Sequence, residues 1–275
     1  MRLGLVGYGR WGKVVARALA RVGDLIAICD TWEERATAAT RDWEDWGVRS
    51  TVFHDDLVGV CDAVWIATPT VDHAATIRFY LDQGIHVLAE KPVVTDLDVA
   101  ADLVDLARKR GVLLMGGFLG IHTGCHGELL ASPRPRELEI VRRNTRPSLS
   151  DGDVLWGLGP HDVASVIAVM GSRPNVVSAT GGVHYCQVEM IWNEGYPARV
   201  SIELDWLAEE RARRVIRNRD FSVNLADTPN RVEPLLREAR EFVGRIGLGP
   251  AEHAEELQRI IDVTSTLARA QATLS

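Results

Sequence analysis

The chain has 275 residues, of which 46% are hydrophobic and 25% charged, and it carries a formal net charge of −7. This length suits one large or two modest domains, and the composition is that of an ordinary folded protein. The acidic balance provides no basic surface for nucleic acid, and no apolar run is long enough to cross a membrane. The four cysteines form no CxxC pair, so we expect a cytoplasmic protein with reduced thiols and no bound metal.

Strands and helices alternate through the first 117 residues. Short apolar strands are predicted at residues 3–6, 24–30, 61–68, 85–91 and 112–118, each separated from the next by a helical pattern. Such alternation predicts a parallel sheet with right-handed crossovers.

The pattern changes from about Arg136. Longer alternating stretches at residues 137–145, 175–185, 186–194, 198–206 and 213–227 predict a mostly antiparallel sheet, and two helices are predicted near 232–243 and 251–274. We therefore predict an α/β fold, with an N-terminal Rossmann dinucleotide-binding domain over residues 1–118. An α+β domain with a largely antiparallel open sheet is predicted over residues 119–275. Its C-terminal helix is free to pack back on the first domain.

The glycine-rich stretch GYGRWG follows the first strand and opens the first helix. Gly7, Gly9 and Gly12 give the GxGxxG spacing: the first permits a tight turn, the second lets a pyrophosphate approach the backbone, and the third lets helix and strand pack closely. Amides at the helix start then face the phosphates. This context predicts dinucleotide binding by the turn, including Arg10 and Trp11.

Asp30 ends the second predicted strand, 18 positions after Gly12. This is near the spacing expected for the ligand of the adenosine ribose hydroxyls, and its charge would repel a 2′-phosphate, so we expect NAD rather than NADP. Arg35 is the one cation close in sequence, and we expect Glu33 and Glu34 to compete for it. The alternative for Asp30 is a helix N-cap.

Lysine is rare in this chain, occurring only at positions 13, 91 and 109. A remaining lysine can be one that arginine would not replace, because a partly buried lysine can release its proton and an arginine cannot. Lys91 follows Glu90 at the end of a predicted strand, on the edge where open α/β sheets bind ligands. The alternative is a surface lysine extended into solvent beside Glu90.

The stretch from Leu155 to Gly171 reads as a helix after Pro160, with His161 and Asp162 in its first turn. Proline and aspartate both suit a first turn, so a simple capped helix is one interpretation. The other is a catalytic pair.

The sequence resembles the Gfo/Idh/MocA oxidoreductases. The resemblance rests on VGYGRWG, WIATPTVDHAATIRFYLDQGIHVLAEKP and VLWGLGPHDVASVIAVMG, and extends more weakly to the final helix. It implies catalytic roles for Lys91 and His161. It also implies cofactor contacts from the two later strand ends, at Thr68, Pro69, His73, Glu90 and Lys91.

The resemblance is closest to a subgroup with LWDLGPHDL-like motifs that acts on nucleotide-linked sugars. Many members carry an aspartate four positions before the histidine, where this chain has Gly157, and Asp162 is a candidate substitute for that carboxylate. The chain is also shorter than usual for the family. The open face of the second sheet implies a homodimer or homotetramer.

Three further candidates lie between these motifs. His122, Cys125 and His126 resemble a fragment of a metal site but lack a fourth ligand at a sensible spacing. Arg143 and Asn144, in RRNTR, suit either a solvated strand end or an anionic group of the substrate. Trp156 suits either a sugar ring or the core.

These observations together predict an NAD-dependent oxidoreductase. It would transfer hydride between nicotinamide and a secondary alcohol or ketone of a sugar, sugar nucleotide or cyclitol, with His161 and Lys91 acting on the reacting oxygen. Two alternatives stay open. One is a cofactor-bound protein with little or no catalysis, and the other is a reductase of an imine or enone-type small molecule.

Overall fold

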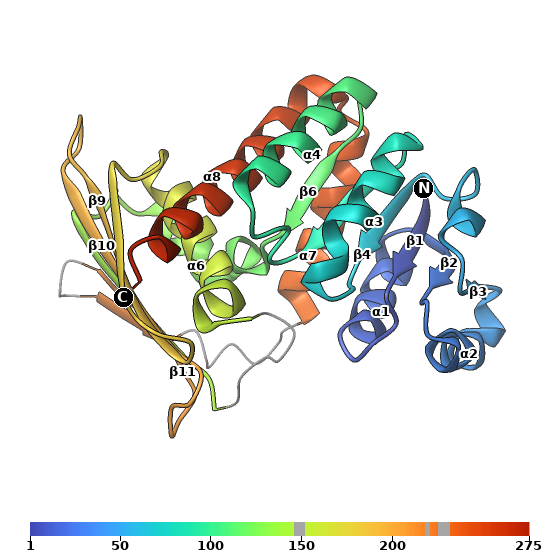
Figure 1. Cartoon of the computed structure of the whole chain (residues 1–275), viewed down its shortest axis with the longest axis horizontal. Helices are drawn as coiled ribbons and strands as arrows, with labels where there is room; N and C mark the ends of the chain where they lie inside the picture. Colours follow the sequence, from blue (N-terminus) through green and yellow to red (C-terminus); the bar gives the residue numbers. More distant parts are fainter. Residues whose placement is uncertain (146–151, 218–220, 225–231, 275) are drawn as a thin grey trace. The chain divides into compact units, whose positions relative to one another are not determined.

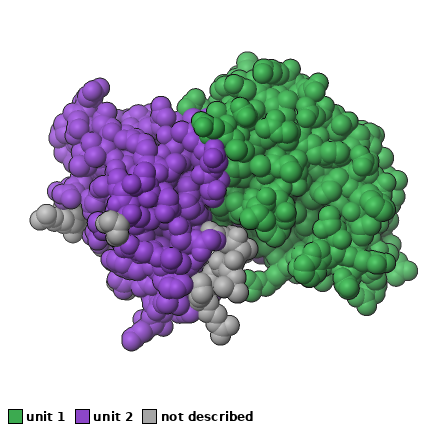
Figure 2. Space-filling model, viewed as in Figure 1, with its two compact units in different colours: residues 1–94, 98–117, 235–260 green, residues 95–97, 118–234, 261–275 purple. Residues whose placement is uncertain are grey.

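The structure is a computed structural model that describes residues 1–275 except 146–151, 218–220, 225–231 and 275. The described chain divides into two compact units (Figures 1 and 2). The first contains residues 1–94, 98–117 and 235–260, and the second contains residues 95–97, 118–234 and 261–275. Among the described helices, none combines the length and the apolar character that a membrane span requires.

The first unit is built on a six-stranded parallel sheet in the order β3-β2-β1-β4-β5-β6. Its strands are β1 (Arg2–Val6), β2 (Asp24–Cys29), β3 (Arg49–Thr51), β4 (Ala63–Ile66), β5 (His86–Glu90) and β6 (Leu114–Gly117). Its connections contain α1 (Gly12–Val22), α2 (Glu33–Asp42), η1 (Glu44–Trp46), η2 (His54–Leu57), α3 (Thr70–Asp82) and α4 (Leu97–Arg110). The central strands are apolar almost throughout because helices cover a parallel sheet on both faces, and all four residues of β4 are buried. The predicted Rossmann sheet is confirmed.

The strand order reverses between β1 and β4. In open α/β sheets, ligands bind outside the carboxyl ends of the strands at this reversal. The turns after β1, β2, β4 and β5 all begin at this edge. They contain the glycine motif, Asp30, the Thr68–Pro69 turn and Lys91.

The chain returns to the first unit near its end, within the stretch of residues 119–275 that the sequence assigned to a second domain whose C-terminal helix is free to pack back. Three elements complete the chain: α7 (Val232–Ile246), η5 (Pro250–His253) and α8 (Ala254–Gln271). Residues 235–260 belong to the first unit (green in Figure 2). Leu235, Ala239 and Phe242 form the buried stripe of α7, at the spacing of one helix face.

The second unit contains a mixed sheet in the order β12-β11-β7-β10-β9-β8. Its strands are β7 (Glu137–Arg143), β8 (Val176–Gly181), β9 (Tyr185–Trp192), β10 (Ala198–Asp205), β11 (Ala212–Arg217) and β12 (Phe221–Asn224). Within the described part of this sheet, β7 and β10 pair in parallel and every other pair is antiparallel, which confirms the prediction. The stretch predicted as one strand at 213–227 supplies β11 and β12, which pair as antiparallel neighbours.

One face of this sheet carries the long helix α6 (Val154–Met170), and two short elements, η3 (Leu119–His122) and α5 (Gly124–Ala131), precede β7. Buried and more exposed residues alternate along β10, so that Val200, Ile202 and Leu204 form its inner row. A Cβ at Gly159 of α6 would lie 3.1 Å from Leu267 Cδ2 on α8 and 3.4 Å from Leu204 Cδ1 on β10. Helix α6 therefore packs closely on β10.

Candidate active site

The glycine turn after β1 has the geometry that its sequence predicts. Gly7 has φ +95°, and a Cβ there would lie 2.7 Å from the carbonyl oxygen of Ala67. A Cβ on Gly12 would lie 2.0 Å from the carbonyl oxygen of Gly7. Gly9 is different, because the nearest atom to its Cβ position is Arg35 Nη1 at 3.8 Å. The turn is thus tight at both ends and open in the middle, which fits a pyrophosphate against the start of α1.

Asp30 supports this turn. Its side chain is 5% exposed, its Oδ2 accepts a hydrogen bond from the Tyr8 amide at 2.7 Å, and its Oδ1 accepts one from the Trp32 amide at 3.0 Å. The helix-cap alternative is wrong, since α2 begins at Glu33 and the residue at its N-cap position is Trp32.

Arg35 lies against Asp30, although Glu33 and Glu34 are neighbours that we expected to compete for it. Its Nη1 is 3.7 Å from Asp30 Oδ2, and its guanidinium carbon is 4.5 Å from the centre of the Trp32 ring. The Trp32 ring is 61% exposed. The end of β2 therefore carries a carboxylate with a cation and an exposed indole beside it.

His73 connects the turns after β4 and β5. It is 1% exposed, with Nδ1 at 3.0 Å from the Pro92 carbonyl oxygen and Nε2 at 3.0 Å from that of Thr68. Burial lowers its pKa. Both ring nitrogens face backbone carbonyls, so His73 fixes the spacing of the two turns. Pro69, in the turn after β4, is exposed.

Glu90, at the end of β5, is held by two indoles. Its Oε1 accepts hydrogen bonds from Trp11 Nε1 at 2.6 Å and from Trp65 Nε1 at 3.1 Å. Burial raises the pKa of Glu90, while the Trp11 hydrogen bond and the positive charge of Lys91 lower it. Trp11 belongs to the glycine turn, so Glu90 links that turn to the half-buried Lys91, which begins a cis peptide bond to Pro92.

His161 and Asp162 do not begin a helix, which corrects the prediction of a helix start after Pro160. Helix α6 begins at Val154, where Asp153 caps it by accepting a hydrogen bond from the Trp156 amide at 3.0 Å. Pro160 lies inside the helix, and His161 follows in its third turn. The sequence signal for a start was misleading, because the true N-cap lies seven residues earlier and proline is tolerated here inside a buried helix.

Asp162 is tied to the sheet of the second unit. It is 2% exposed, and both of its oxygens accept hydrogen bonds from the guanidinium of Arg142 on β7. His161 is half-buried, and its carbonyl oxygen accepts a hydrogen bond from Ser165 Oγ at 2.9 Å. The Asp162–Arg142 ion pair therefore anchors α6 to β7.

This anchoring role can be measured. We expect Asp162→Asn to lower the free energy of unfolding by about 2–3 kcal/mol, because it leaves the half-buried Arg142 without its charged partner. Chemical denaturation followed by circular dichroism checks this, with the exposed pair variant Arg143→Gln as a control that should change stability little. An unchanged midpoint in Asp162→Asn would show that the pair does not anchor the helix.

The remaining predicted substrate residues are engaged elsewhere. Arg143 Nε donates to Glu203 Oε1 at 2.6 Å, and the backbone of Asn144 bonds to Asp205 and Ala208. Trp156 is only 7% exposed, which agrees with the core alternative better than with a sugar platform. Arg146 lies outside the described residues.

The described part of the second unit contains no cluster of side chains that could bind a metal ion. His122 and His126 are buried, and the Thr123 hydroxyl caps the first turn of α5. No group of three or more histidine, cysteine or acidic side chains able to hold a metal occurs among the described residues, and the Cys125 side chain lies outside them.

Gly157 packs closely against Trp206, a contact that the sequence did not predict. A Cβ at this position would lie 2.1 Å from Cζ2 of Trp206, a ring that is 1% exposed. The indole thus fills the space one helical turn before His161. Nothing in the spacing of the motif indicated which side chain would do so.

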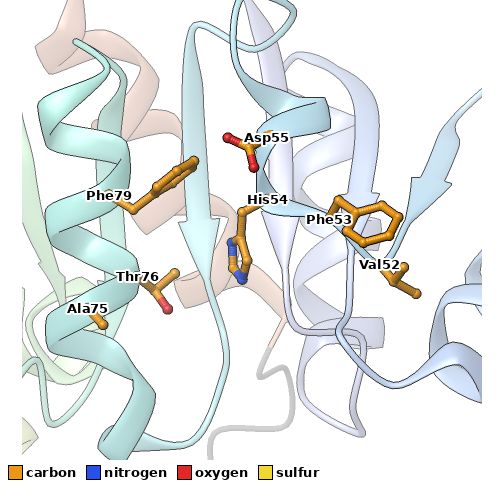
Figure 3. Close-up of a pocket in the computed structure, with 7 residues that line it drawn as sticks. All are labelled: Val52, Phe53, His54, Asp55, Ala75, Thr76 and Phe79. Carbon is orange, nitrogen blue, oxygen red and sulfur yellow. The ribbon is translucent and has the colours of Figure 1, made fainter.

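A pocket of about 390 Å³ in the first unit was also missed (Figure 3). It is lined by residues 52–55 after β3 and by Ala75, Thr76 and Phe79 of α3. In Figure 3 the side chains of Thr76 and Phe79 project from α3 toward the loop that carries His54. His54 Nδ1 lies 3.1 Å from the Tyr80 hydroxyl, and burial lowers the pKa of His54, so the ring is neutral near pH 7.

Residues 1–118 match the model of the Gfo/Idh/MocA family, described as an oxidoreductase family with an NAD-binding Rossmann fold. Over these residues the chain belongs to the Gfo/Idh/MocA oxidoreductase family. The match covers the glycine turn, Asp30 and the Lys91 turn in one stretch.

The chain is also similar in sequence to named proteins. The chain is 32% identical over 184 residues to a UDP-N-acetylglucosamine 3-dehydrogenase of Acidithiobacillus ferrooxidans, spanning 66% of this chain and 58% of that protein. It is 29% identical over 196 residues to an inositol 2-dehydrogenase of Rhizobium meliloti, spanning 66% of this chain and 59% of the relative. These alignments thus cover somewhat more than half of each relative's length.

Solved structures share the fold over the whole chain. A UDP-N-acetylglucosamine 3-dehydrogenase structure from Acidithiobacillus ferrooxidans superposes with a TM-score of 0.86 at 23% identity, covering 100% of this chain and 97% of that one. GenD2 from gentamicin A biosynthesis, in complex with NAD, superposes with a TM-score of 0.84 at 20% identity, covering 99% and 93%. The family fold is therefore present in both units.

Proposed function

We propose that this family member is an NAD(P)-dependent oxidoreductase acting on a secondary alcohol or ketone of a sugar, sugar nucleotide or cyclitol. The observation that carries the proposal is the edge of the first sheet. There a glycine turn with no room for a Cβ at Gly7 or Gly12, a buried Asp30 and the Glu90–Lys91 turn follow β1, β2 and β5 of the same sheet. Two aligned relatives are named as dehydrogenases of a nucleotide sugar and of inositol, and these names support the proposed substrate class.

The residues present fit a dinucleotide. Gly7, Gly9 and Gly12, with Arg10 and Trp11, would hold the pyrophosphate, and Asp30 would accept the ribose hydroxyls. Thr68, Pro69, Glu90 and Lys91 would lie along the same edge, with His73 fixing the two turns. The pocket beside Val52 would receive the adenine, since Val52 follows Thr51, whose carbonyl oxygen accepts the Asp30 amide at 3.1 Å. When bound, the nicotinamide supplies the hydride acceptor or donor.

The reacting oxygen is handled by two side chains in this proposal. Lys91 would donate a hydrogen bond to it and stabilise its negative charge as it develops. His161 would take the hydroxyl proton in the oxidative direction and return it in the reductive one. The two roles are exchangeable, since both groups carry protons. Asp162 would help by holding its segment of α6 in place, and Arg143, Asn144 and Trp156 stand as secondary candidates for substrate contact.

We propose NAD as the preferred cofactor, by at least about tenfold, because the Asp30 carboxylate repels a ribose phosphate. Asp30→Asn keeps one acceptor oxygen for the turn and removes the charge, so we expect the preference to fall severalfold. Titration of each variant with NADH and NADPH, followed by fluorescence, measures this, with Asp24→Asn at the exposed start of β2 as control. Equal affinity of the unaltered chain for both dinucleotides would contradict the preference.

The alternative activities have separate outcomes in one assay. The purified chain is incubated with NAD and either UDP-N-acetylglucosamine or myo-inositol, and with NADH and a ketone, imine or enone panel, while NADH absorbance is followed. Turnover of an alcohol or ketone supports the proposal, and turnover confined to imines or enones supports the alternative reductase. Binding of NADH without any turnover supports a regulatory or assembly role.

The oligomeric state and the cellular compartment belong to the same proposal. We infer a homodimer or homotetramer formed through the open face of the second sheet, which static light scattering distinguishes from a monomer. The described cysteines Cys29, Cys61 and Cys186 are free and buried, which supports a reducing, cytoplasmic compartment.

A further inference from the structure

We propose that the Trp11 side chain is a positioning residue for Lys91, because it ties the end of β5 to the glycine turn through the Glu90 carboxylate. This inference rests on the proposed function, in which Lys91 acts on the reacting oxygen and the glycine turn holds the pyrophosphate. The glycine motif accounts for the backbone of Trp11 and gives its side chain no task.

The first observation is the direction of the Trp11 indole. The backbone of Trp11 is fixed at the start of α1, where its carbonyl oxygen accepts the amides of Val14 and Val15 at 2.8 and 3.0 Å. Its side chain makes no capping bond and is 36% exposed, and its Nε1 donates to Glu90 Oε1 at 2.6 Å. An indole has one N–H donor. Glu90 engages that donor, so any contact of Trp11 to a pyrophosphate is left to its backbone amide.

The second observation is that Glu90 receives a second indole from inside the sheet. Trp65 on β4 is 0% exposed, and its Nε1 donates to the same oxygen, Glu90 Oε1, at 3.1 Å. Its backbone pairs with Leu88 of β5, so this donor is part of the sheet. On the other side, a Cβ at Gly117 of β6 would lie 3.1 Å from Glu90 Cα, so β5 and β6 are in close contact there. Glu90 is thus a fixed acceptor to which Trp11 joins the glycine turn.

The third observation is that Lys91 lies between two held neighbours. Before it, Glu90 accepts the two indole hydrogen bonds. After it, the Pro92 carbonyl oxygen lies 3.0 Å from Nδ1 of His73, a residue of α3 that is 1% exposed. The backbone of Lys91 is therefore set from both sides. Of these contacts, the one from Trp11 relates Lys91 to the site proposed for the dinucleotide.

The Trp11 hydrogen bond also acts on the charge of Glu90. Burial raises the pKa of Glu90, while the Trp11 hydrogen bond and the positive charge of Lys91 lower it. The indole N–H therefore favours the ionised carboxylate, next to the cation of the following residue. Removing the Trp11 donor should loosen the turn and weaken this balance of charge, and both effects reach Lys91.

The scarcity of lysine gives a direct readout of the setting of Lys91. The chain has three lysines, at positions 13, 91 and 109, so peptide mass spectrometry separates the acetylation rate of half-buried Lys91 from that of exposed Lys109. Acetic anhydride reacts with free amines. A lysine released from a fixed turn beside a carboxylate should react faster with it.

The experiment compares Trp11→Phe, Glu90→Gln, their double variant and Trp46→Phe, a control at a position that is 70% exposed, in the full chain. Trp11→Phe keeps an aromatic ring and removes the donor, so Lys91 should be acetylated about tenfold faster, with Lys109 unchanged. In the Glu90→Gln background, where the bond is neutral and about half as strong, the same change should raise the rate about threefold or less. Trp46→Phe should follow the wild type.

Turnover and NADH binding are measured on the same preparations, with NAD and UDP-N-acetylglucosamine or myo-inositol as substrates. Trp11→Phe should lower kcat about tenfold and leave the NADH dissociation constant within about threefold, because the backbone amides of the turn remain. An indole that only supported the fold would lower stability without this difference between kcat and affinity. Circular dichroism confirms that each variant is folded.

Three results would overturn the proposal. The first is an unchanged Lys91 acetylation rate in folded Trp11→Phe. The second is a full tenfold rise in the Glu90→Gln background, which would mean that Trp11 does not act through Glu90. The third is an unchanged kcat of Trp11→Phe with a substrate that the wild type turns over. A wild type that binds no NADH would instead refute the proposed function, and the acetylation series would still decide whether Trp11 positions Lys91.

Discussion

Lys91→Met is expected to lower turnover by about a hundredfold or more while NADH still binds. Loss of a positioned group that holds or moves a proton in the transition state costs this much, and methionine keeps the volume of the lysine stem. The measurement is kcat and the NADH dissociation constant of the same preparation. Lys109→Met, an exposed position on α4, is the matched control and should leave both quantities unchanged.

Full activity in Lys91→Met would remove Lys91 from the chemistry. A variant that no longer binds NADH would place Lys91 in cofactor binding instead, since Lys91 also balances the charge of Glu90. His161→Asn then separates the two proton-handling roles, because it should lower kcat without changing the NADH dissociation constant.

Gly157→Asp is expected to leave little folded protein. The new Cβ would lie 2.1 Å from the Trp206 ring, and the carboxylate would enter a space that this ring fills. Overpacking alone costs about 1–3 kcal/mol, and burying an unpaired charge adds several more, which together approach the total stability of a typical domain. Soluble expression and thermal unfolding measure the loss.

Gly127→Ala on α5 is the matched control for this prediction. A Cβ at Gly127 meets nothing within 4 Å, so alanine should be neutral or stabilising by up to about 1 kcal/mol. If Gly157→Asp instead unfolds at the wild-type temperature, Trp206 moves freely and the aspartate that the family resemblance implies is compatible with this chain. The missing aspartate is in our account a packing consequence of Trp206.

The sequence was sufficient for the Rossmann unit because each local signal there agrees with the sheet it builds. Backbone contacts that any dinucleotide turn makes require glycine at positions 7 and 12. The apolar runs of β1 and β4 fit only buried strands of a parallel sheet. The second sheet was also predictable in kind from its period of two. Its parallel β7–β10 pair was not, because strand pairing between distant segments leaves no local pattern.

The details of the site depended on contacts between distant residues. Asp162 reads as a first-turn aspartate, yet its partner Arg142 lies 20 positions away on strand β7. Arg35 has two neighbouring glutamates that could compete for it, yet it lies against Asp30. Charge and burial at these positions follow from tertiary packing.

Direct titration of the folded chain with NADH and NADPH tests the central claim without knowledge of the substrate. We predict saturable binding by the wild type, tighter for NADH, and its loss in Gly12→Val, whose side chain would meet the Gly7 carbonyl oxygen. Circular dichroism confirms that each preparation is folded. A folded wild type that binds neither dinucleotide would contradict the account.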